Sequence, residues 1–241
     1  MAGFDKTRWA EEDFARKYLE GADINVVDRW RLLKILQSFY NHFHGERKQN
    51  RVLDLGCGDG IIAHALLKID SSLSATLIDG SEDMLHKAKK RLAGFKNVQY
   101  IRASFQELLS TDIKLPEFEF IVSSLAIHHL TRGEKKSLFK YLYAHLTPGG
   151  HFVNIDIILS PTEALESWYM KLWVEWIIEK RSALHLELSS EDVTRDYKEK
   201  EHYSKLDTLA RQLNALEEIG FQDVDCYYKH GIFTMYGGSR K

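Results

Sequence analysis

Cysteine is scarce in this sequence. Its 241 residues include only two cysteines, Cys57 and Cys226, with no spacing pattern between them. A disulfide framework needs pairs of cysteines, and a structural zinc site needs closely spaced thiols. We therefore expect neither a disulfide framework nor a zinc site, and the cysteine content is typical of a reducing compartment such as the cytoplasm.

Long apolar runs are also missing. The stretch 155–159 is interrupted by Asp156, whereas a membrane-spanning helix needs roughly 20 predominantly apolar residues. Acidic side chains occupy residues 11–13, which is unlike both a signal peptide and an Arg-rich presequence. We expect a cytoplasmic protein that does not associate with membranes.

Neither sign of charge dominates the chain. Lysine and arginine total 33 against 35 aspartates and glutamates, for a formal net charge of -2. Such a balance provides no field that would attract polyanions, so nucleic acid is not an expected partner. With only three prolines and no Pro-rich linker or internal repeat, the chain is predicted to form a single domain over residues 1–241.

What the sequence does contain is an alternation of short β-rich runs with helical patterns. Strands are predicted at 51–55, 75–79, 98–101, 118–123 and 151–159, and helices at 61–69, 81–92 and 132–146. Ser81 is the expected N-cap of its helix, and Thr147-Pro-Gly-Gly is the expected turn before the fifth strand. This alternation predicts an α/β fold with right-handed crossovers and a largely parallel sheet.

Further helical segments surround this predicted core. Residues 1–48 contain helical periodicity from Trp9 to His44 and are expected to form a two-helix N-terminal cap on a core spanning 51–157. Residues 161–205 break the alternation and predict a helical insertion. Residues 206–241 predict a helix followed by a closing hairpin of two strands.

The cap and the insertion are both candidate lids. Ligands of open α/β sheets bind above the carboxyl ends of the strands, which these segments are expected to cover. In the insertion, Tyr169, Trp173 and Trp176 recur at helical spacing. Aromatic residues in such a stripe can line a ligand pocket, but packing of the added helix onto the body is the favoured interpretation.

A glycine-rich loop follows the first predicted strand. In the segment Leu53-Asp-Leu-Gly-Cys-Gly-Asp-Gly, Gly56 and Gly58 lie where a strand turns into a helix, and the missing Cβ atoms allow close contact between backbone and ligand. Asp79 ends the next strand, where nucleotide-binding α/β folds place a carboxylate against ribose hydroxyls. A bare tight turn would explain the glycines, but it would not explain the acid at this offset.

Other details of the loop narrow the choice of nucleotide. Ile61 stands where the dinucleotide fingerprint has its third glycine, which disfavours NAD. No Gly-Lys-Ser or Gly-Lys-Thr string occurs, which disfavours a P-loop. Asp54 would repel phosphates but suits a cationic or zwitterionic ligand. The pattern therefore favours a cofactor without phosphate groups.

With these features the chain resembles the class I methyltransferases, Rossmann-like enzymes that bind S-adenosylmethionine. The likeness spans roughly 52–156, and Val52-Leu-Asp-Leu-Gly-Cys-Gly-Asp-Gly resembles the family's first motif. The resemblance implies a three-layer sandwich with a mostly parallel seven-stranded sheet, an antiparallel last strand, a helical N-terminal extension and a helical insertion after strand 5.

The same resemblance implies roles for individual residues in cofactor binding. The methionine part would be held around Asp54, Gly56, Cys57 and Gly58. The ribose would lie at Asp79 and Gly80, and the adenine beside Met84. Ser104 and Phe105 occupy the position where the family usually offers an acid or amide to adenine. Ser123 and Leu125, at the end of the fourth strand, would line the cofactor.

His128 and His129 are the candidate catalytic residues. They follow the fourth strand in a segment that resembles the family motif beside the sulfonium, and either could accept a proton from an oxygen or nitrogen acceptor. Packing against the cofactor, or capping of the next helix, is an equally good explanation for a histidine here. Further candidates that the sequence does not assign are Tyr18, His185, His202, Tyr203 and His230, for which surface placement is an equally good explanation. Asp156 is expected to face the site alone.

Several functional classes remain open at this point. Methyl transfer to a small molecule is the leading hypothesis, with no metal ion expected. Methyl transfer to tRNA or protein would require a basic rim beside the site. A non-catalytic S-adenosylmethionine-binding partner protein is the third alternative. Whether the chain forms a homodimer, and which atom is methylated, are also left open.

Overall fold

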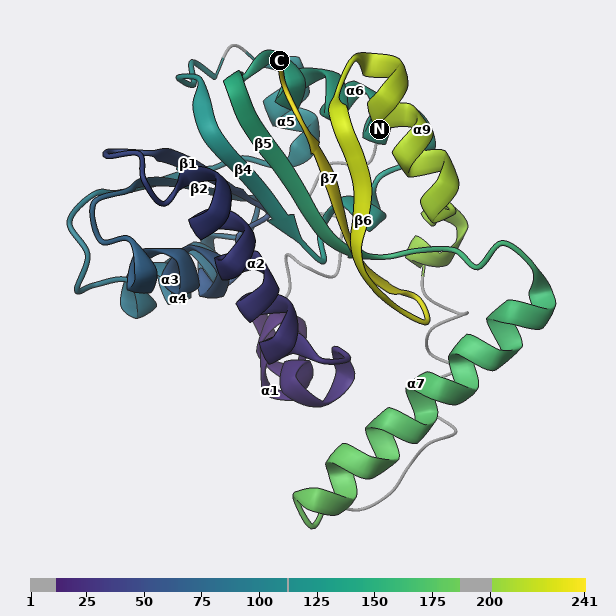
Figure 1. The fold of residues 1–241 in the computed structure, drawn as a ribbon. Coiled ribbons are helices and arrows are strands. Elements are labelled where there is room, and N and C mark those ends of the chain that lie inside the picture. Colours follow the sequence, from purple (N-terminus) through teal and green to yellow (C-terminus); the bar gives the residue numbers. More distant parts are fainter. Residues whose placement is uncertain (1–11, 112, 187–200) are drawn as a thin grey trace.

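The computed structural model of the chain describes residues 12–111, 113–186 and 201–241 (Figure 1). Its centre is a seven-stranded sheet with the strand order β3-β2-β1-β4-β5-β7-β6. The strands are β1 (Arg51–Leu55), β2 (Ser74–Asp79), β3 (Val98–Arg102), β4 (Phe118–Ser124), β5 (Leu146–Ile157), β6 (Gln222–His230) and β7 (Phe233–Ser239).

Strand direction confirms the predicted topology. The pairs β2/β3, β1/β2, β1/β4 and β4/β5 are all parallel. The last strand, β7, is antiparallel to both of its neighbours, β5 and β6. It forms the predicted hairpin with β6, and Gly231 in the turn has a φ of 56°, a left-handed conformation that favours glycine. The sheet is mostly parallel, with an antiparallel last strand, as expected.

Helices cover both faces of the sheet and make three layers. They are α1 (Glu12–Asn25), α2 (Arg29–His44), α3 (Ile61–Ile69), α4 (Glu82–Arg91), α5 (Phe105–Ser110), η3 (Ile127–His129), α6 (Arg132–Ala144), α7 (Glu163–Ala183), η4 (Glu201–Lys205) and α9 (Leu209–Ile219). One apolar cluster joins α2, α3 and α4 to one face of the sheet, and a second joins α5, α6 and α9 to the other. Successive residues of a strand point to opposite faces, so Val52 belongs to the first cluster and Leu53 to the second.

Local sequence signals determine where several helices begin. The Ser81 hydroxyl accepts a hydrogen bond from the Met84 backbone N–H, which confirms Ser81 as the N-cap of α4. Thr131 caps α6 in a reciprocal arrangement with Glu134. None of the helices described for this chain has the length and apolar character that a bilayer crossing requires.

Two local expectations differ from the structure. The fifth strand begins at Leu146 and not after the Thr147-Pro-Gly-Gly segment, because Leu146 pairs with Phe118 at the start of β4. The register then shifts, and the regular pairing resumes at His151 with Phe120. The short helix α5 was not expected. Its signal is the capping box formed by Ser104 and Glu107, which precedes only two turns of apolar periodicity.

The described parts of the N-terminal cap and of the insertion pack on each other. The indole N–H of Trp173 donates to the Asn25 carbonyl at 2.8 Å, and that of Trp176 donates to the Ile24 carbonyl at 2.9 Å. The expected packing role of these tryptophans is confirmed. In Figure 1, α1 and α7 lie beyond the end of the sheet at which β4 and β5 terminate. The predictions made for Trp9 and for 187–200 fall outside the described residues.

Candidate functional site

The glycine loop joins β1 to α3. The backbone N–H groups of Gly56 and Cys57 donate to the Ile78 carbonyl at 2.8 and 3.1 Å, which ties the loop to the end of β2. Gly56 has a φ of 67°, and a Cβ atom there would lie 2.5 Å from the Cβ of Ala126. The first glycine is therefore required by packing as well as by backbone conformation.

Gly58 differs from Gly56 in its surroundings. Its φ is 53°, and a Cβ atom at this position would have no neighbouring atom within 4 Å. Its N–H donates to Oδ2 of Asp79 at 2.8 Å. The space over Gly58 is open, so the loop presents bare backbone on which a ligand can lie beside a carboxylate.

Asp79 organises this corner of the site. Its Oδ1 accepts the N–H of Ser81 at 2.8 Å while Oδ2 accepts that of Gly58, and Gly80 lies between. Burial raises the pKa of Asp79, and these two backbone hydrogen bonds oppose the increase. A carboxylate offers about four acceptor positions, so two protein donors leave it able to accept hydroxyl groups of a ligand.

Asp54 and Cys57 lie behind the loop. Asp54 is fully buried, and its Oδ2 accepts the Ala63 N–H at 3.1 Å in the first turn of α3. Its Oδ1 has no hydrogen-bond partner among the described residues, and burial raises the pKa of this carboxyl well above its usual value. Burial also raises the pKa of the Cys57 thiol. Direct ligand contact by either side chain remains a prediction.

The residues expected around adenine lie beside the loop but differ in their contacts. Met84 is buried at the start of α4. The Phe105 ring comes within 3.3 Å of the position that a Gly56 Cβ would occupy. The Ser104 hydroxyl is engaged in the α5 cap, where it hydrogen-bonds with Glu107. Of the two residues predicted at this position, Phe105 is the one in contact with the loop.

Ser123 and Leu125 hold the end of β4 in place. The Ser123 hydroxyl donates to the Leu55 carbonyl at 2.7 Å, and the Leu125 N–H donates to the Ile155 carbonyl at 2.8 Å. Leu125 has a φ of 51°, which is uncommon for a residue other than glycine. This turn directs the chain into η3, which carries both candidate histidines.

The structure gives these two histidines different surroundings. His128 Nδ1 lies 2.6 Å from Asp156 Oδ1, and both side chains are buried. The ring of His129 packs against that of His128, with centroids 4.0 Å apart. The expectation that Asp156 faces the site alone is wrong, because β5 places this residue next to η3. The side-chain cap of α6 comes from Thr131 and not from a histidine.

A buried hydrogen-bond chain continues behind Asp156. Asn154 donates to Asp156 Oδ2 at 3.3 Å and to the Tyr236 hydroxyl at 2.8 Å, and this hydroxyl donates to Gln212 Oε1 at 2.5 Å. Burial raises the pKa of Tyr236 well above its usual value. Neither Tyr236 nor Gln212 was identified from the sequence, because neither carries a motif and both meet β5 only in the folded chain.

Tyr18 brings α1 into the same region. Burial raises the pKa of its phenol to about 12, with Arg29 opposing the increase and the charges of Asp156 and Asp59 adding to it. Asp59 belongs to the glycine loop and Asp156 to the histidine pair. The phenol therefore lies within electrostatic reach of both halves of the site.

Sequence comparisons find known proteins that are similar to the central part of the chain. Residues 52–150 match the model of a family described as methyltransferase domain. An uncharacterised methyltransferase of Mycobacterium bovis is 28% identical over 123 residues, covering 51% of this chain and 58% of that protein. The chain thus matches little more than half the length of this relative. A carboxy-S-adenosyl-L-methionine synthase of Shewanella sediminis is 22% identical over 200 residues, covering 82% of this chain and 78% of the relative.

A structural comparison extends the likeness to the whole fold. The magnesium protoporphyrin IX methyltransferase of Synechocystis, solved with bound S-adenosylhomocysteine, superposes with a TM-score of 0.64 at 12% identity, covering 97% of each chain. At this identity the similarity establishes the fold alone. It places the central sheet and both helical layers in an arrangement already known in methyltransferases.

Proposed function

We propose that this chain transfers a methyl group from S-adenosylmethionine to a small molecule. The premise is that residues 52–150 form a methyltransferase domain of the class I, Rossmann-like family. The observation that carries the proposal is the open backbone surface at Gly58, bordered by the Asp79 carboxylate. The buried pair of His128 and Asp156, at the end of the neighbouring strands, supports a catalytic role.

The residues of the loop fit this cofactor. S-adenosylmethionine supplies a methyl group that is already activated by its sulfonium. Gly56 and Gly58 would support its methionine part, Asp79 would accept its ribose hydroxyls, and Phe105 would flank the adenine. The buried Oδ1 of Asp54 has no hydrogen-bond partner among the described residues, which leaves an acceptor behind the loop for a hydrogen-bond donor of the ligand.

His128 is assigned the role of general base. Its Nδ1 faces Asp156, which orients the ring, so we assign Nε2 as the atom that takes up the acceptor's proton. Asp156 is in turn held by Asn154. A buried carboxylate behind a histidine is the arrangement by which enzymes fix the tautomer of a catalytic base.

A small acceptor is favoured by two observations. The formal net charge of -2 offers no strong attraction for a polyanion. In addition, α1 and α7 lie beyond the carboxyl ends of β4 and β5, where ligands of open α/β sheets bind, and methyl transfer depends mainly on alignment and exclusion of water.

Isothermal titration with S-adenosylhomocysteine tests the cofactor site. We expect saturable binding by the unaltered protein, weakened at least about tenfold by Asp79→Asn, because charge-assisted hydrogen bonds to the ribose are lost. Asp225→Asn is the matched control, since Asp225 also accepts a backbone N–H on a strand but lies on β6. Its affinity should equal that of the unaltered protein.

The proposal fails if the unaltered protein shows no affinity for the nucleoside, or if Asp79→Asn binds as tightly as the control. Melting temperatures of both variants check that each is folded. Tight binding without turnover, across a panel of small hydroxylated and amine acceptors, would instead favour a non-catalytic binding protein.

A further inference from the structure

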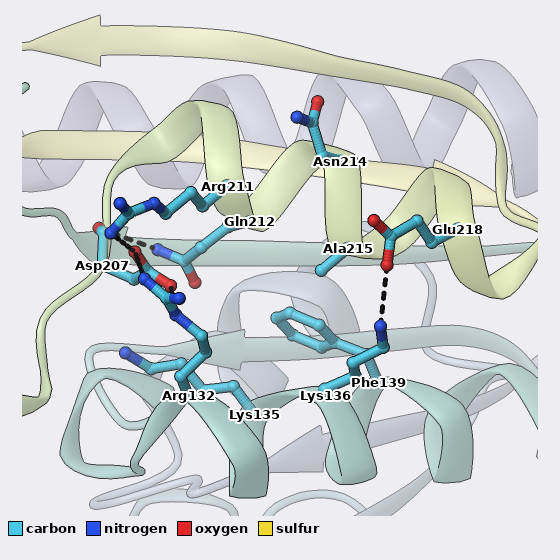
Figure 2. A pocket seen from close by; sticks show the side chains of 10 residues that line it. All are labelled: Arg132, Lys135, Lys136, Phe139, Asp207, Arg211, Gln212, Asn214, Ala215 and Glu218. Atoms are coloured by element: carbon cyan, nitrogen blue, oxygen red, sulfur yellow. Dashed lines mark hydrogen bonds and ion pairs between the residues drawn. The ribbon is translucent and has the colours of Figure 1, made fainter.

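A cleft of about 230 Å³ lies between α6 and α9, in the helical layer that packs on the sheet (Figure 2). None of the glycine-loop residues lines it. Its walls are formed by Arg132, Lys135, Lys136, Phe139, Asp207, Arg211, Gln212, Asn214, Ala215 and Glu218. The proposed methyl transfer assigns no role to this cleft.

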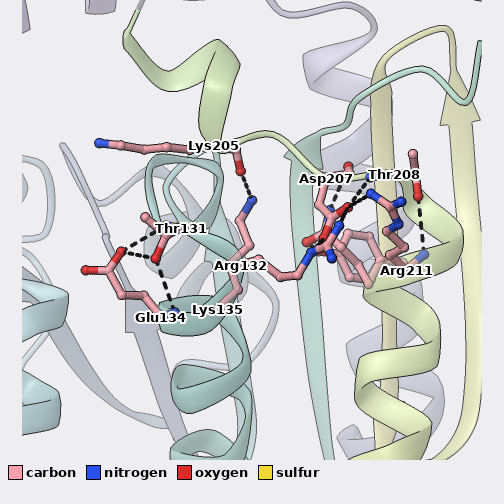
Figure 3. Close-up of polar contacts among 10 residues, drawn as sticks. Thr131, Arg132, Glu134, Lys135, Lys205, Asp207, Thr208 and Arg211 are labelled. Atoms are coloured by element: carbon pink, nitrogen blue, oxygen red, sulfur yellow. Dashed lines mark hydrogen bonds and ion pairs between the residues drawn. The ribbon is translucent and has the colours of Figure 1, made fainter.

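Positive charge is concentrated at one end of the cleft. Arg132 Nε and Arg211 Nη1 both approach the buried Asp207 carboxylate, at 3.1 and 3.4 Å. Lys135, also buried, donates from Nζ to the Lys205 carbonyl at 2.6 Å (Figure 3). Among the described residues that line this end, three cations face a single carboxylate.

The backbone adds to this potential. Figure 2 shows α6 and α9 running in the same direction, with their N-termini at the end of the cleft near Asp207. Helix N-termini carry partial positive charge and favour acidic side chains in the first turn. The first turn of α9 has no acidic residue and instead carries Arg211. Arg211 forms an i,i+4 ion pair with Asp207, so this one carboxylate is shared by cations from both helices.

The rest of the cleft is neutral and partly apolar. Phe139, which is almost fully buried, and Ala215 line its centre. Lys136 and Glu218 form an ion pair at 2.7 Å toward the other end. A ligand would therefore meet cations at one end only, with apolar surface beside them.

We propose that this cleft binds a small organic oxyanion, a phosphate or carboxylate attached to a compact apolar group. Guanidinium groups bind such oxyanions with paired hydrogen bonds. The volume lies below the range of roughly 300 to 1,000 Å³ that is usual for drug-sized ligands, so the apolar group must be small. The proposal does not depend on the activity assigned to the glycine loop and the histidine pair.

Nucleic acid is the alternative occupant of a basic cleft. It is disfavoured here because Asp207 and Glu218 offset part of the charge and because the cationic end is confined to one turn of each helix. An extended phosphate backbone would need cations spread along a longer surface.

Titration of the full chain with phenyl phosphate, monitored by calorimetry at low ionic strength, tests the proposal. We expect saturable binding that weakens as salt is added and that falls at least about tenfold in Arg211→Gln, because a charge-assisted contact is removed. Benzoate in place of phenyl phosphate tells whether a phosphate group is required. Lys171→Gln is the control, since Lys171 is also an exposed cation within an i,i+4 ion pair, but on α7.

Absence of saturable binding of both phenyl phosphate and benzoate at millimolar concentration overturns the proposal. Equal weakening in Arg211→Gln and Lys171→Gln overturns it as well, because the anions would then be responding to overall charge. If a single-stranded RNA oligonucleotide binds more tightly than phenyl phosphate, and Arg211→Gln abolishes its binding, the cleft belongs to a nucleic-acid surface. Melting curves of both variants confirm that they are folded.

Discussion

Two adjacent histidines, His128 and His129, differ in their contacts although the sequence offers no means of ranking them. His128 is buried against the Asp156 carboxylate, whereas the described contact of His129 is with the His128 ring. A carboxylate partner fixes the orientation and the tautomer of an imidazole. At the scale of single residues, this contact is the reason to assign the base to one position only.

We predict that His128→Gln lowers the rate of methyl transfer about 100- to 10,000-fold, the usual contribution of a general base. The matched variant His129→Gln should stay within a few-fold of the unaltered protein. Initial rates of S-adenosylhomocysteine release, with an acceptor that the unaltered protein methylates, measure the difference. Both variants should keep their affinity for S-adenosylhomocysteine, and equal rate losses in the two would contradict the assignment.

The buried hydrogen-bond chain from Asp156 through Asn154 and Tyr236 to Gln212 gives a second prediction at this scale. Tyr236→Phe removes the hydroxyl that links Asn154 to Gln212 and leaves buried polar groups without their partner. We expect a loss of about 1 to 3 kcal/mol in the free energy of unfolding, measured by urea denaturation. Tyr203→Phe is the control for loss of a tyrosine hydroxyl. The hydroxyl of Tyr203 donates to Glu166 and is not part of the hydrogen-bond chain behind Asp156. An unchanged stability in Tyr236→Phe would show that the buried chain is not stabilising.

At the scale of elements, α1 and α7 are held together by the indole groups of Trp173 and Trp176. Both N–H groups donate to carbonyls in the last turn of α1, where the helix has no partners of its own for these acceptors. Two segments far apart in the sequence thus form one assembly beyond the end of the sheet (Figure 1).

We predict that the double variant Trp173→Phe, Trp176→Phe speeds amide hydrogen exchange in α1 without changing exchange in β1 and β4. Each lost hydrogen bond is worth about 0.5 to 1.5 kcal/mol, which is enough to raise local opening several-fold. Trp168→Phe is the control, because Trp168 is 53% exposed on the same helix. Equal exchange in α1 of both variants would contradict the role assigned to the indoles.

At the scale of the whole molecule, a pair formed by the buried His44 and the partly buried His151 joins α2 to the sheet. His44 Nε2 lies 3.1 Å from His151 Nδ1 on β5, next to the Phe39 and Phe43 rings. Burial lowers the pKa of His44 to about 3 and that of His151 to about 4, in each case with Arg47 acting in the same direction. Both imidazoles are therefore neutral in the folded protein at neutral pH.

Stability should fall when the solution is acidified. Both folded pKa values lie below the ordinary histidine value, so the unfolded chain binds more protons as the pH drops below about 6.5. The full stability is present above that pH and is lost progressively toward pH 4. For His44 alone the loss at pH 5 is about 2 kcal/mol, measured as a shift of the urea midpoint.

The variant His44→Leu should flatten this dependence between pH 7 and pH 5. His86→Gln removes an exposed histidine of α4 and should leave the slope as it is in the unaltered protein. Parallel slopes in both variants would mean that other groups cause the acid sensitivity.

Much of the architecture could be predicted because its causes are local. Strand and helix periodicity, the Ser81 cap and the glycine loop are encoded within a few residues each, and the structure confirms the parallel core around them. The alternation of strands and helices also predicts that Gly58 and Asp79 lie at adjacent strand ends, since parallel strands bring their carboxyl ends to one edge of the sheet. The short helix α5 and the early start of β5 lacked so clear a local pattern.

What the sequence by itself determined is thus the order of strands and helices along the chain and the glycine loop that resembles the first motif of class I methyltransferases. Only the tertiary structure decided which side chains meet. His128 and Asp156 are 28 positions apart, Arg132 and Asp207 are 75 apart, and Asn154 and Tyr236 are 82 apart. The physical reason is that these contacts form only when β5, β7 and α9 pack together. A local hydrophobic pattern predicts a helix or a strand, but it does not predict which distant elements pack against it.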